Sequence, residues 1–236
     1  MIIKKKILII IPVLNEQNNI IPLVKKIINQ LKKNTNILFI DDNSIDKTRD
    51  KIYEAKNKYK NIYLIKRKSK LGIGSAHKCG IKWAYKKKFQ IIITMDCDGT
   101  HNPIYLKKLI SSLEKNEIII TNRFLKKNSL KGWSLWRGFL TRIRHFVIRI
   151  VLNINYDSSG GYRCYDAKKV RIKDILLAQD NGYAFFWESI FILHKKKYKI
   201  SEIPIILPSR ATGTSKMRLK DIFYSVIYLI YIYFKN

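Results

Sequence analysis

The sequence predicts an α/β fold in which a mostly parallel sheet carries helices on both of its faces. Over the first 121 residues, short apolar segments alternate with longer segments of helical periodicity. The short segments are nearly continuous runs of Ile, Leu and Val, which is typical of strands that are buried on both faces. No Pro-rich linker or internal repeat divides the chain, so we expect the α/β unit to dominate it.

The predicted elements follow in order along the chain. In the first half we expect strands at 7–12, 36–41, 62–66, 90–95 and 117–121, and helices at 18–33, 46–58, 73–87 and 103–115. In the second half we expect a helix over 133–153, a Gly-Ser turn at 158–161, two shorter helices, a strand over 199–206 and an apolar helix over 222–234. The second half is predicted to complete a site on the first rather than to form a separate domain.

Composition excludes several classes of protein. The chain is 47% hydrophobic and 12% aromatic, enough to fill a core, so it is not a disordered basic tail. Its three cysteines are too few and too scattered for a disulfide scaffold or a zinc site, and a reduced, cytosol-facing chain is expected. We expect no signal peptide and no transmembrane helix, because the longest apolar run covers residues 222–234 and a span needs about 20 residues.

The charge balance is strongly basic, with 47 Lys and Arg against 17 Asp and Glu, a net charge of +30. Most of the cations are Lys on predicted helix surfaces, which is typical of a solvated surface. Five of the 11 Arg residues lie between 123 and 149, and Arg binds phosphate through two parallel hydrogen bonds. A polyanionic partner is therefore the second interpretation: a nucleic acid, an anionic membrane or a phosphorylated ligand.

Carboxylates are scarce, and several of them follow predicted strands. Glu16 follows the first strand, Asp41 and Asp42 end the second, and Asp96 and Asp98 end the fourth. Open α/β sheets bind ligands at this edge, and two Asp one residue apart can present oxygens to Mg²⁺ or Mn²⁺. Asp also favours helix N-caps and turns. Because these acids gather at one edge of a very basic chain, we favour a metal that bridges diphosphate oxygens.

Three further segments carry weaker signals. Residues 71–76 include two glycines and predict a tight turn with close backbone approach, rather than a dinucleotide site. The helix over 133–153 is amphipathic, with Arg137, Thr141 and Arg144 on one face; it is either packed on the core through its apolar side or bound to a membrane surface or phosphate. The helix over 222–234 carries a Tyr stripe and is buried either in protein or in lipid.

The order of the motifs resembles a known family. The motifs are Pro12-Val13-Leu14-Asn15-Glu16, Asp41-Asp42-Asn43-Ser44, the 96–101 segment, Asn122-Arg123-Phe124, the 157–163 segment, the 182–188 segment and the 210–216 loop. Together they resemble the polyprenol (dolichyl) phosphate mannosyltransferases, within the family 2 glycosyltransferases. The match runs from about residue 6 to 217, and its second half is what points to a polyprenyl phosphate acceptor.

This resemblance implies a glycosyltransferase A-type fold, with a catalytic domain over 1–217 and a C-terminal apolar helix over 218–236 that associates with a membrane. It implies a metal, Mg²⁺ or Mn²⁺, at Asp96, Asp98 and Thr100, and an acceptor phosphate at Arg123, Arg137 and Thr141. Catalytic roles would fall to Asp98, Arg123 and Arg137. The residues implied for nucleotide-sugar binding are Pro12, Leu14, Glu16, Ile40, Asp42, Asp96, Cys97, Asp98, Arg123, Arg210 and Lys216.

The expected activity is transfer of mannose from GDP-mannose to polyprenyl or dolichyl phosphate, with inversion, at the cytoplasmic face of a membrane. A phosphate monoester is already mostly anionic at neutral pH, so the reaction needs no catalytic base. The same mechanism with UDP-glucose remains open, since nothing in the sequence separates guanine from uracil. A nucleic-acid-binding protein and a catalytically silent membrane adaptor are the other classes, and the strand-end carboxylates argue against both. The sequence identifies no protein partner.

Overall fold

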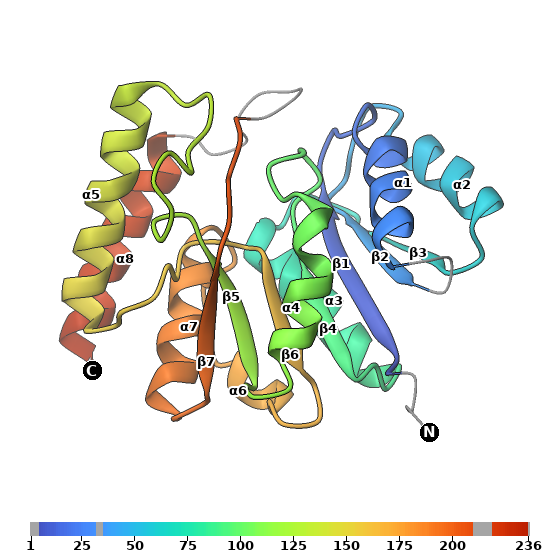
Figure 1. Ribbon diagram of the computed structural model, residues 1–236. Coiled ribbons are helices and arrows are strands. Elements are labelled where there is room, and N and C mark those ends of the chain that lie inside the picture. The colour runs from blue at the N-terminus through green and yellow to red at the C-terminus, as the bar shows by residue number, and fades with distance from the viewer. Residues whose placement is uncertain (1–4, 32–34, 210–218, 236) are drawn as a thin grey trace.

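Figure 1 shows the computed structural model, which describes residues 5–31, 35–209 and 219–235. A seven-stranded sheet forms its centre, in the order β3-β2-β1-β4-β6-β5-β7. The strands are β1 (Ile7–Val13), β2 (Asn36–Asp41), β3 (Ile62–Lys66), β4 (Ile91–Thr94), β5 (Ile118–Asn122), β6 (Arg163–Asp166) and β7 (Ile200–Pro204). The mostly parallel α/β sheet that the sequence predicts is confirmed.

Strand β6 is the one strand of this sheet that the sequence analysis missed. It lies between β4 and β5 and runs antiparallel to both. Its four residues begin with Arg163 and end with Asp166, so they lack the apolar pattern of a buried strand. Arg163 is nevertheless buried, because its guanidinium donates hydrogen bonds to the carbonyls of Ser158 (2.7 Å), Gly160 (2.8 Å) and Phe186 (2.6 Å). The strand thereby fixes the 157–161 loop at the edge of the sheet where β4 ends.

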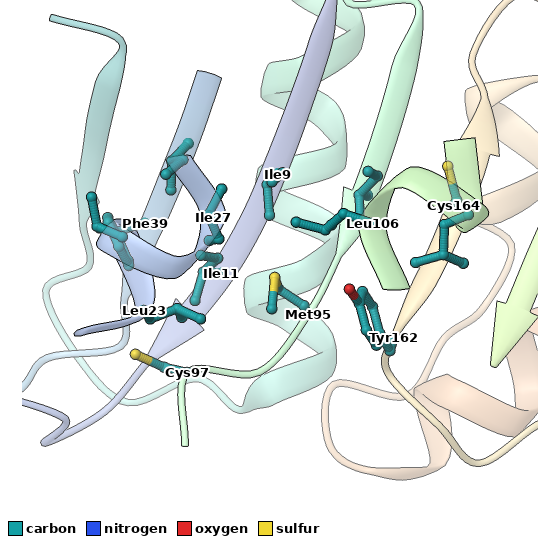
Figure 2. Close-up of a cluster of buried hydrophobic side chains, with 14 of the residues drawn as sticks. Ile9, Ile11, Leu23, Ile27, Phe39, Met95, Cys97, Leu106, Tyr162 and Cys164 are labelled. Atoms are coloured by element: carbon teal, nitrogen blue, oxygen red, sulfur yellow. The ribbon is translucent and has the colours of Figure 1, made fainter. Parts of the chain in front are cut away.

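Helices cover both faces of the sheet, and each face has its own core. The helices are α1 (Ile20–Leu31), α2 (Thr48–Lys58), α3 (Ile73–Lys86), α4 (Leu106–Ser112), α5 (Leu135–Leu152), α6 (Ile172–Ile175), α7 (Ala184–Lys195) and α8 (Leu219–Lys235), with a 3₁₀ turn η1 (Pro103–Tyr105) before α4. Helices α1, α2 and α4 pack on one face, where Figure 2 shows Leu23, Ile27 and Leu106 against Ile9 and Ile11 of β1. Helices α3, α6 and α7 pack on the other.

The helix predicted over 103–115 is shorter than expected and begins in a different way. Residues 103–105 form the η1 turn, and the side chain of Asn102 caps it by accepting a hydrogen bond from the amide of Ile104 at 3.1 Å. Side-chain capping also starts α5, where the hydroxyl of Ser134 accepts from the amide of Arg137 at 3.3 Å. These caps fix the directions in which both segments leave the strand-end loops.

Helix α5 does not pack on the core through its apolar side, which was one of the two interpretations of the sequence. Only Ile148 and Leu152 of its side chains are buried, and both lie on the same helix face as Arg144. The apolar side faces outward, and its exposed residues are Leu135, Trp136, Phe139, Leu140, Ile143, Phe146, Val147 and Ile150. The expectation that this apolar side packs on the core is therefore wrong, because α5 meets the protein through its basic face.

Helix α8 lies beside α5 at the end of the molecule, next to α7 (Figure 1). Leu229 and Ile232 are buried in a small third core with Ile148 and Trp187. The rest of α8 is mostly exposed, including Phe223, Val226, Ile230, Tyr233 and Phe234. None of the described helices is long and apolar enough to cross a bilayer.

The glycine turn before α3 makes the close backbone approach that the sequence predicts, and its partner is the chain itself. Gly72 has a φ of 94°, and a Cβ there would lie 2.4 Å from the carbonyl oxygen of Asn181. A Cβ on Gly74 would lie 2.6 Å from the Cβ of Phe185. These glycines therefore let the start of α3 pack against the loop that leads into α7.

Candidate active site

The carboxyl ends of β1 and β2 meet in a pair of interlocked loops. Asn15 adopts a left-handed φ of 55°, its amide donates to the hydroxyl of Ser44 at 2.9 Å, and its side-chain oxygen accepts from the amide of Ile45 at 2.9 Å. Within the strands, Pro12 is the register partner of Ile40. The structure thus brings the first two motifs of the sequence analysis together at one edge of the sheet.

The predicted nucleotide residues of these two strands differ in exposure. Pro12, Leu14 and Glu16 are half-buried at the rim, where a ligand can reach them. Ile40 is fully buried in the core between the sheet and α3. Asp42 is also buried, and both of its oxygens are engaged.

The contacts of Asp42 organise the loop that follows β3. One carboxylate oxygen lies 2.9 Å from Nη1 of Arg67 and accepts from the amide of Leu71 at 3.0 Å. The other oxygen accepts from the amide of Gly72 at 3.1 Å. Asp42 therefore connects the end of β2 to the turn that precedes α3.

Asp96, Cys97 and Asp98 follow β4 at the same edge. Asp96 keeps about a third of its side chain exposed (32%), whereas Asp98 is buried and accepts from both the amide (3.1 Å) and the hydroxyl (2.7 Å) of Thr100. Burial raises the pKa of the Cys97 thiol, and the charges of Glu16, Asp98 and Asp96 raise it further. Burial is the larger cause, and the negative charges act in the same direction, so the thiol stays protonated.

His101 packs beside these carboxylates. Its Nδ1 accepts a hydrogen bond from the amide of Asp96 at 2.8 Å and lies 3.6 Å from the Asp96 carboxylate. The ring stacks on Tyr162 with centroids 5.0 Å apart. His101 therefore helps to orient the loop that carries Asp96.

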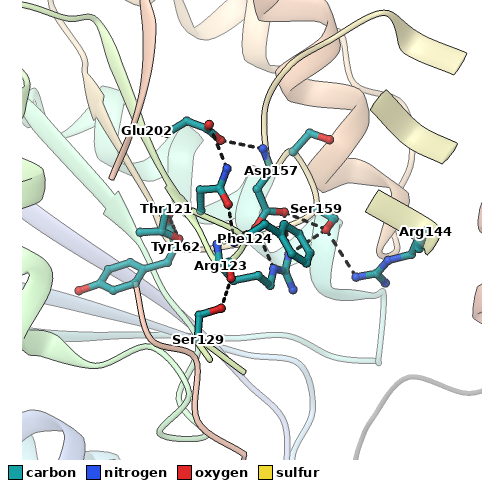
Figure 3. Close-up of polar contacts among 12 residues, drawn as sticks. Thr121, Arg123, Phe124, Ser129, Arg144, Asp157, Ser159, Tyr162 and Glu202 are labelled. Atoms are coloured by element: carbon teal, nitrogen blue, oxygen red, sulfur yellow. Dashed lines mark hydrogen bonds and ion pairs between the residues drawn. The ribbon is translucent and has the colours of Figure 1, made fainter. Parts of the chain in front are cut away.

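Arg123 anchors a buried polar network on the other side of the edge, shown in Figure 3. Its Nε and Nη2 donate to the two oxygens of Asp157 at 2.8 and 2.9 Å, and its amide donates to the same carboxylate at 3.2 Å. Burial opposes ionisation of both groups, but their mutual charge and hydrogen bonds dominate: the pKa of Asp157 is lowered and that of Arg123 is raised. The pair is thus a charged unit.

The network continues in two directions from this pair. Towards β7, Glu202 accepts from the amide of Asp157 at 2.7 Å and from the side chain of Asn122 at 3.0 Å; burial raises its pKa. Towards α5, Nη2 of Arg123 donates to the hydroxyl of Ser159 at 2.8 Å, and Arg144 reaches the same hydroxyl at 3.4 Å (Figure 3). Two guanidinium groups therefore converge on Ser159.

The two sides of the edge meet at Arg123. A small cavity of about 20 Å³ is lined by His101, Thr121, Arg123, Asp157 and Gly160, among others. A Cβ on Gly160 would lie 3.7 Å from Nη2 of Arg123, and a Cβ on Gly161 would lie 3.5 Å from Oδ1 of Asp96. The structure thus brings Asp96 and Arg123 to adjacent residues of one loop, and Asp98 follows Asp96 by two residues.

Other predicted residues lie apart or outside the described chain. Arg137 is exposed near the start of α5, with its guanidinium 3.9 Å from the centre of the Trp133 ring, and Thr141 is half-buried one turn further along. Arg210 and Lys216 lie outside the described residues.

Sequence analysis assigned no role to Asp157, Ser159 or Glu202, although they complete the Arg123 network. Asp157 had a visible signal, because it is one of few acids and stands in a motif of the resemblance. Ser159 and Glu202 had none, since a Ser in a Gly-Ser turn and a Glu in a strand are common. Their roles depend on β6 and β7 lying on either side of β5, which the sequence pattern alone did not reveal.

Comparison with known proteins agrees with this geometry. Residues 8–171 match the family model described as glycosyl transferase family 2. The chain is 28% identical over 213 residues to the undecaprenyl-phosphate mannosyltransferase of Micrococcus luteus, covering 90% of this chain and 87% of that protein. It is 27% identical over 216 residues to the polyprenol monophosphomannose synthase of Mycolicibacterium smegmatis, covering 90% and 81%.

Solved structures share the fold. Glucosyl-3-phosphoglycerate synthase from Mycobacterium tuberculosis, in complex with UDP, superposes with a TM-score of 0.67 at 15% identity, covering 98% of this chain and 80% of that one. The same enzyme in complex with Mn²⁺, UDP and glucosyl-3-phosphoglycerate gives a TM-score of 0.64 at 16% identity, covering 96% and 78%. The strand-end site, the glycosyltransferase A-type sheet and the match over most of its length together show that this chain belongs to glycosyl transferase family 2.

Proposed function

We propose that the protein transfers mannose from GDP-mannose to a polyprenyl phosphate, giving a lipid-linked sugar. The observation that carries this proposal is the meeting of two opposite charge clusters at one sheet edge: Asp96 and Asp98 directly after β4, and Arg123 beside Arg144. The names of the relatives in Micrococcus luteus and Mycolicibacterium smegmatis support mannosyl transfer to a polyprenyl phosphate.

The donor side fits a divalent cation. Asp96 and Asp98 would hold the ion, with Thr100, whose hydroxyl donates to Asp98 at 2.7 Å, as the third residue of the predicted metal site. Two carboxylates with the remaining positions filled by diphosphate oxygens and water form a normal site for Mg²⁺ or Mn²⁺. The ion would neutralise charge on the leaving diphosphate. The hydroxyl of Thr100 donates to the Asp98 carboxylate and helps to fix its position. Asp96 lies in a turn whose backbone amide donates to His101.

The acceptor side fits a phosphate that attacks without a general base. Arg123 is fixed by Asp157 and lies within reach of Asp96, so it can position an anionic oxygen near the sugar of a bound donor. A phosphate monoester is already mostly ionised at neutral pH. Direct attack on the anomeric carbon inverts its configuration, and an α-linked donor would give a β-linked mannosyl phosphate.

We further propose that the catalytic domain spans 1–217 and that α8, together with the outer face of α5, rests on an anionic membrane at its cytoplasmic face. The outward side chains on α5 and α8 form one apolar surface on adjacent helices, which we call the α5–α8 surface. Such a surface inserts into the interfacial region of a bilayer without spanning it. The net charge of +30 adds attraction to anionic headgroups.

Polar substitutions on the α5–α8 surface test this placement. The pair Phe139→Ser and Phe223→Ser removes two exposed rings (53% and 70% exposed) and should lower binding to anionic vesicles at least tenfold while leaving the melting temperature within a few degrees. The matched control is Ile104→Ser on η1, which is 60% exposed and lies outside this surface. Equal sedimentation of the pair and the wild-type protein with vesicles would contradict the proposal.

A donor panel tests the sugar nucleotide. GDP-mannose, UDP-glucose and UDP-galactose are each offered with Mg²⁺ or Mn²⁺ and a short polyprenyl phosphate. The proposal predicts that kcat/KM for GDP-mannose exceeds that for either UDP-sugar by at least tenfold, which corresponds to about 1.4 kcal/mol of discrimination. Faster transfer from UDP-glucose would keep the mechanism and replace the donor.

A further inference from the structure

One face of helix α5 carries a stripe of polar residues whose exposure to solvent decreases along the helix. Arg137, Thr141 and Arg144 are spaced i, i+4 and i+7, so they share one helix face with the buried Ile148. Arg137 is exposed, Thr141 and Arg144 are half-buried, and Ile148 is buried. The exposure of these residues therefore falls from the outer end of the helix inward, and Figure 3 shows Arg144 beside Ser159 and Arg123.

Arg144, at the inner end of the stripe, has few of its hydrogen bonds satisfied. Its Nη2 reaches the hydroxyl of Ser159 at 3.4 Å, which is a weak contact. Its Nε is buried and has no hydrogen-bond partner among the described residues. A buried N–H without a partner is unfavourable, and more so on a charged group. A ligand oxygen at this position would supply the missing acceptor.

The charges around Arg144 are also unbalanced. Asp157 is committed to Arg123 through three hydrogen bonds, and no ion pair to Arg144 occurs within 4.0 Å in the described part of the chain. Burial and the positive charge of Arg123 lower the pKa of Arg144 to about 10, so it remains protonated at neutral pH. Around Ser159 there are thus two guanidinium groups and one carboxylate, and this net positive charge favours an anion.

The position of Arg144 separates it from the donor carboxylates. Arg144 contacts the 157–161 loop at Ser159, with 3.4 Å between its Nη2 and the hydroxyl oxygen. A Cβ on Gly160 would lie 3.7 Å from Nη2 of Arg123, and a Cβ on Gly161 would lie 3.5 Å from Oδ1 of Asp96. Arg144, Arg123 and Asp96 therefore meet this loop in that order. The opposite face of α5 belongs to the exposed α5–α8 surface, along which a lipid chain can lie while its headgroup enters next to Arg144.

We propose that Arg144 is an inner ligand of the acceptor phosphate, which it holds together with Arg123 and Ser159. The planar guanidinium can offer Nε and one Nη as a fork to two phosphate oxygens. This proposal rests on the proposed function, because it identifies the acceptor as a phosphate monoester bound on the α5 side of the site. It assigns Arg137 and Thr141 to the outer part of the path and Arg144 to the position of attack.

The test measures phosphate binding directly and does not depend on sugar transfer. Geranyl phosphate, which is soluble, is titrated calorimetrically into the full-length protein saturated with GDP and Mg²⁺. Arg144→Met should weaken its binding at least tenfold while the Kd for GDP stays within twofold of wild type. The matched control is Arg142→Met, an exposed arginine on the same helix, which should bind geranyl phosphate normally. Arg144→Lys keeps the charge without the fork and should give an intermediate Kd.

Two outcomes would overturn this assignment. One is equal binding of geranyl phosphate by wild type and Arg144→Met, with Arg144→Lys also unchanged. The other is loss of GDP affinity in Arg144→Met and Arg144→Lys when both melt like wild type, which would place Arg144 on the donor. If the wild type transfers no mannose but geranyl phosphate binding still depends on Arg144, the proposed function fails and the phosphate site stands. Geraniol, which lacks the phosphate, should not bind in any variant.

Discussion

Asp98→Asn should lower kcat/KM for sugar transfer by about a hundredfold or more while the protein stays folded. Asn retains the side-chain oxygen that accepts from the amide and hydroxyl of Thr100, so the local turn is preserved. The substitution removes one negative charge from the pair that would hold the cation beside the diphosphate. Losing one charge-stabilising group from an active site costs about 10²–10³ in rate.

The control for this substitution is Asp50→Asn on the exposed face of α2, which makes the same chemical change away from the site. It should stay within twofold of wild type. Raising the Mn²⁺ concentration should recover part of the activity of Asp98→Asn, because a weakened site fills at higher metal concentration. Near-normal turnover of Asp98→Asn, or undiminished turnover of wild type in EDTA, would contradict a metal at this pair.

Asp157→Asn should destabilise the protein by about 3–5 kcal/mol, because it leaves the buried Arg123 without its counter-charge. Activity should fall as well, since Arg123 and Ser159 lose the group that aligns them. The pKa of Asp157 is lower in the folded protein than in the unfolded chain. Its ionised form therefore stabilises the fold above the unfolded pKa of about 3.9, and this stabilisation is lost as pH falls towards the pKa of the folded state. The free energy of unfolding, measured by urea denaturation, should therefore differ less between wild type and Asp157→Asn at pH 3 than at pH 7.

A second variant separates stability from activity at this pair. Arg123→Met combined with Asp157→Leu replaces the ion pair by apolar groups of similar volume, and it should recover at least half of the lost stability. It should recover no transfer, because the guanidinium that positions the phosphate is gone. If the double variant regains both stability and transfer activity, the Arg123–Asp157 ion pair has only a structural role.

The sequence was a good guide to the half of the site built on β1, β2 and β4. Their strands are continuous apolar runs, and the carboxylates that follow them necessarily meet at one edge of a parallel sheet. This reasoning identifies Asp96 and Asp98 from the sequence alone. Ile40 and Asp42 were assigned to the nucleotide by resemblance, but Ile40 lies in the core, and Asp42 holds Arg67 and Gly72.

The other half of the site depends on packing that a sequence pattern does not encode. Strand β6 is held by the buried side chain of Arg163. Because the strand begins with a charged residue, the pattern of hydrophobic residues does not predict it. Helix α5 was correctly predicted as amphipathic, but its periodicity cannot tell which side faces the protein. In the structure Ile148 and Leu152 pack in the third core with residues of α7 and α8, and Arg144 on the same side of α5 reaches Ser159.

Mannosyl transfer to a lipid phosphate is the central claim, and one measurement tests it directly. The purified protein is incubated with GDP-[¹⁴C]mannose, Mg²⁺ or Mn²⁺, and either a polyprenyl phosphate or the polyprenol of the same chain length. We predict a labelled lipid with the phosphate acceptor alone, and a β-linked mannosyl phosphate in its NMR spectrum. Transfer to the free polyprenol, an α-linked product, or no labelled lipid with any phosphate acceptor would contradict the account.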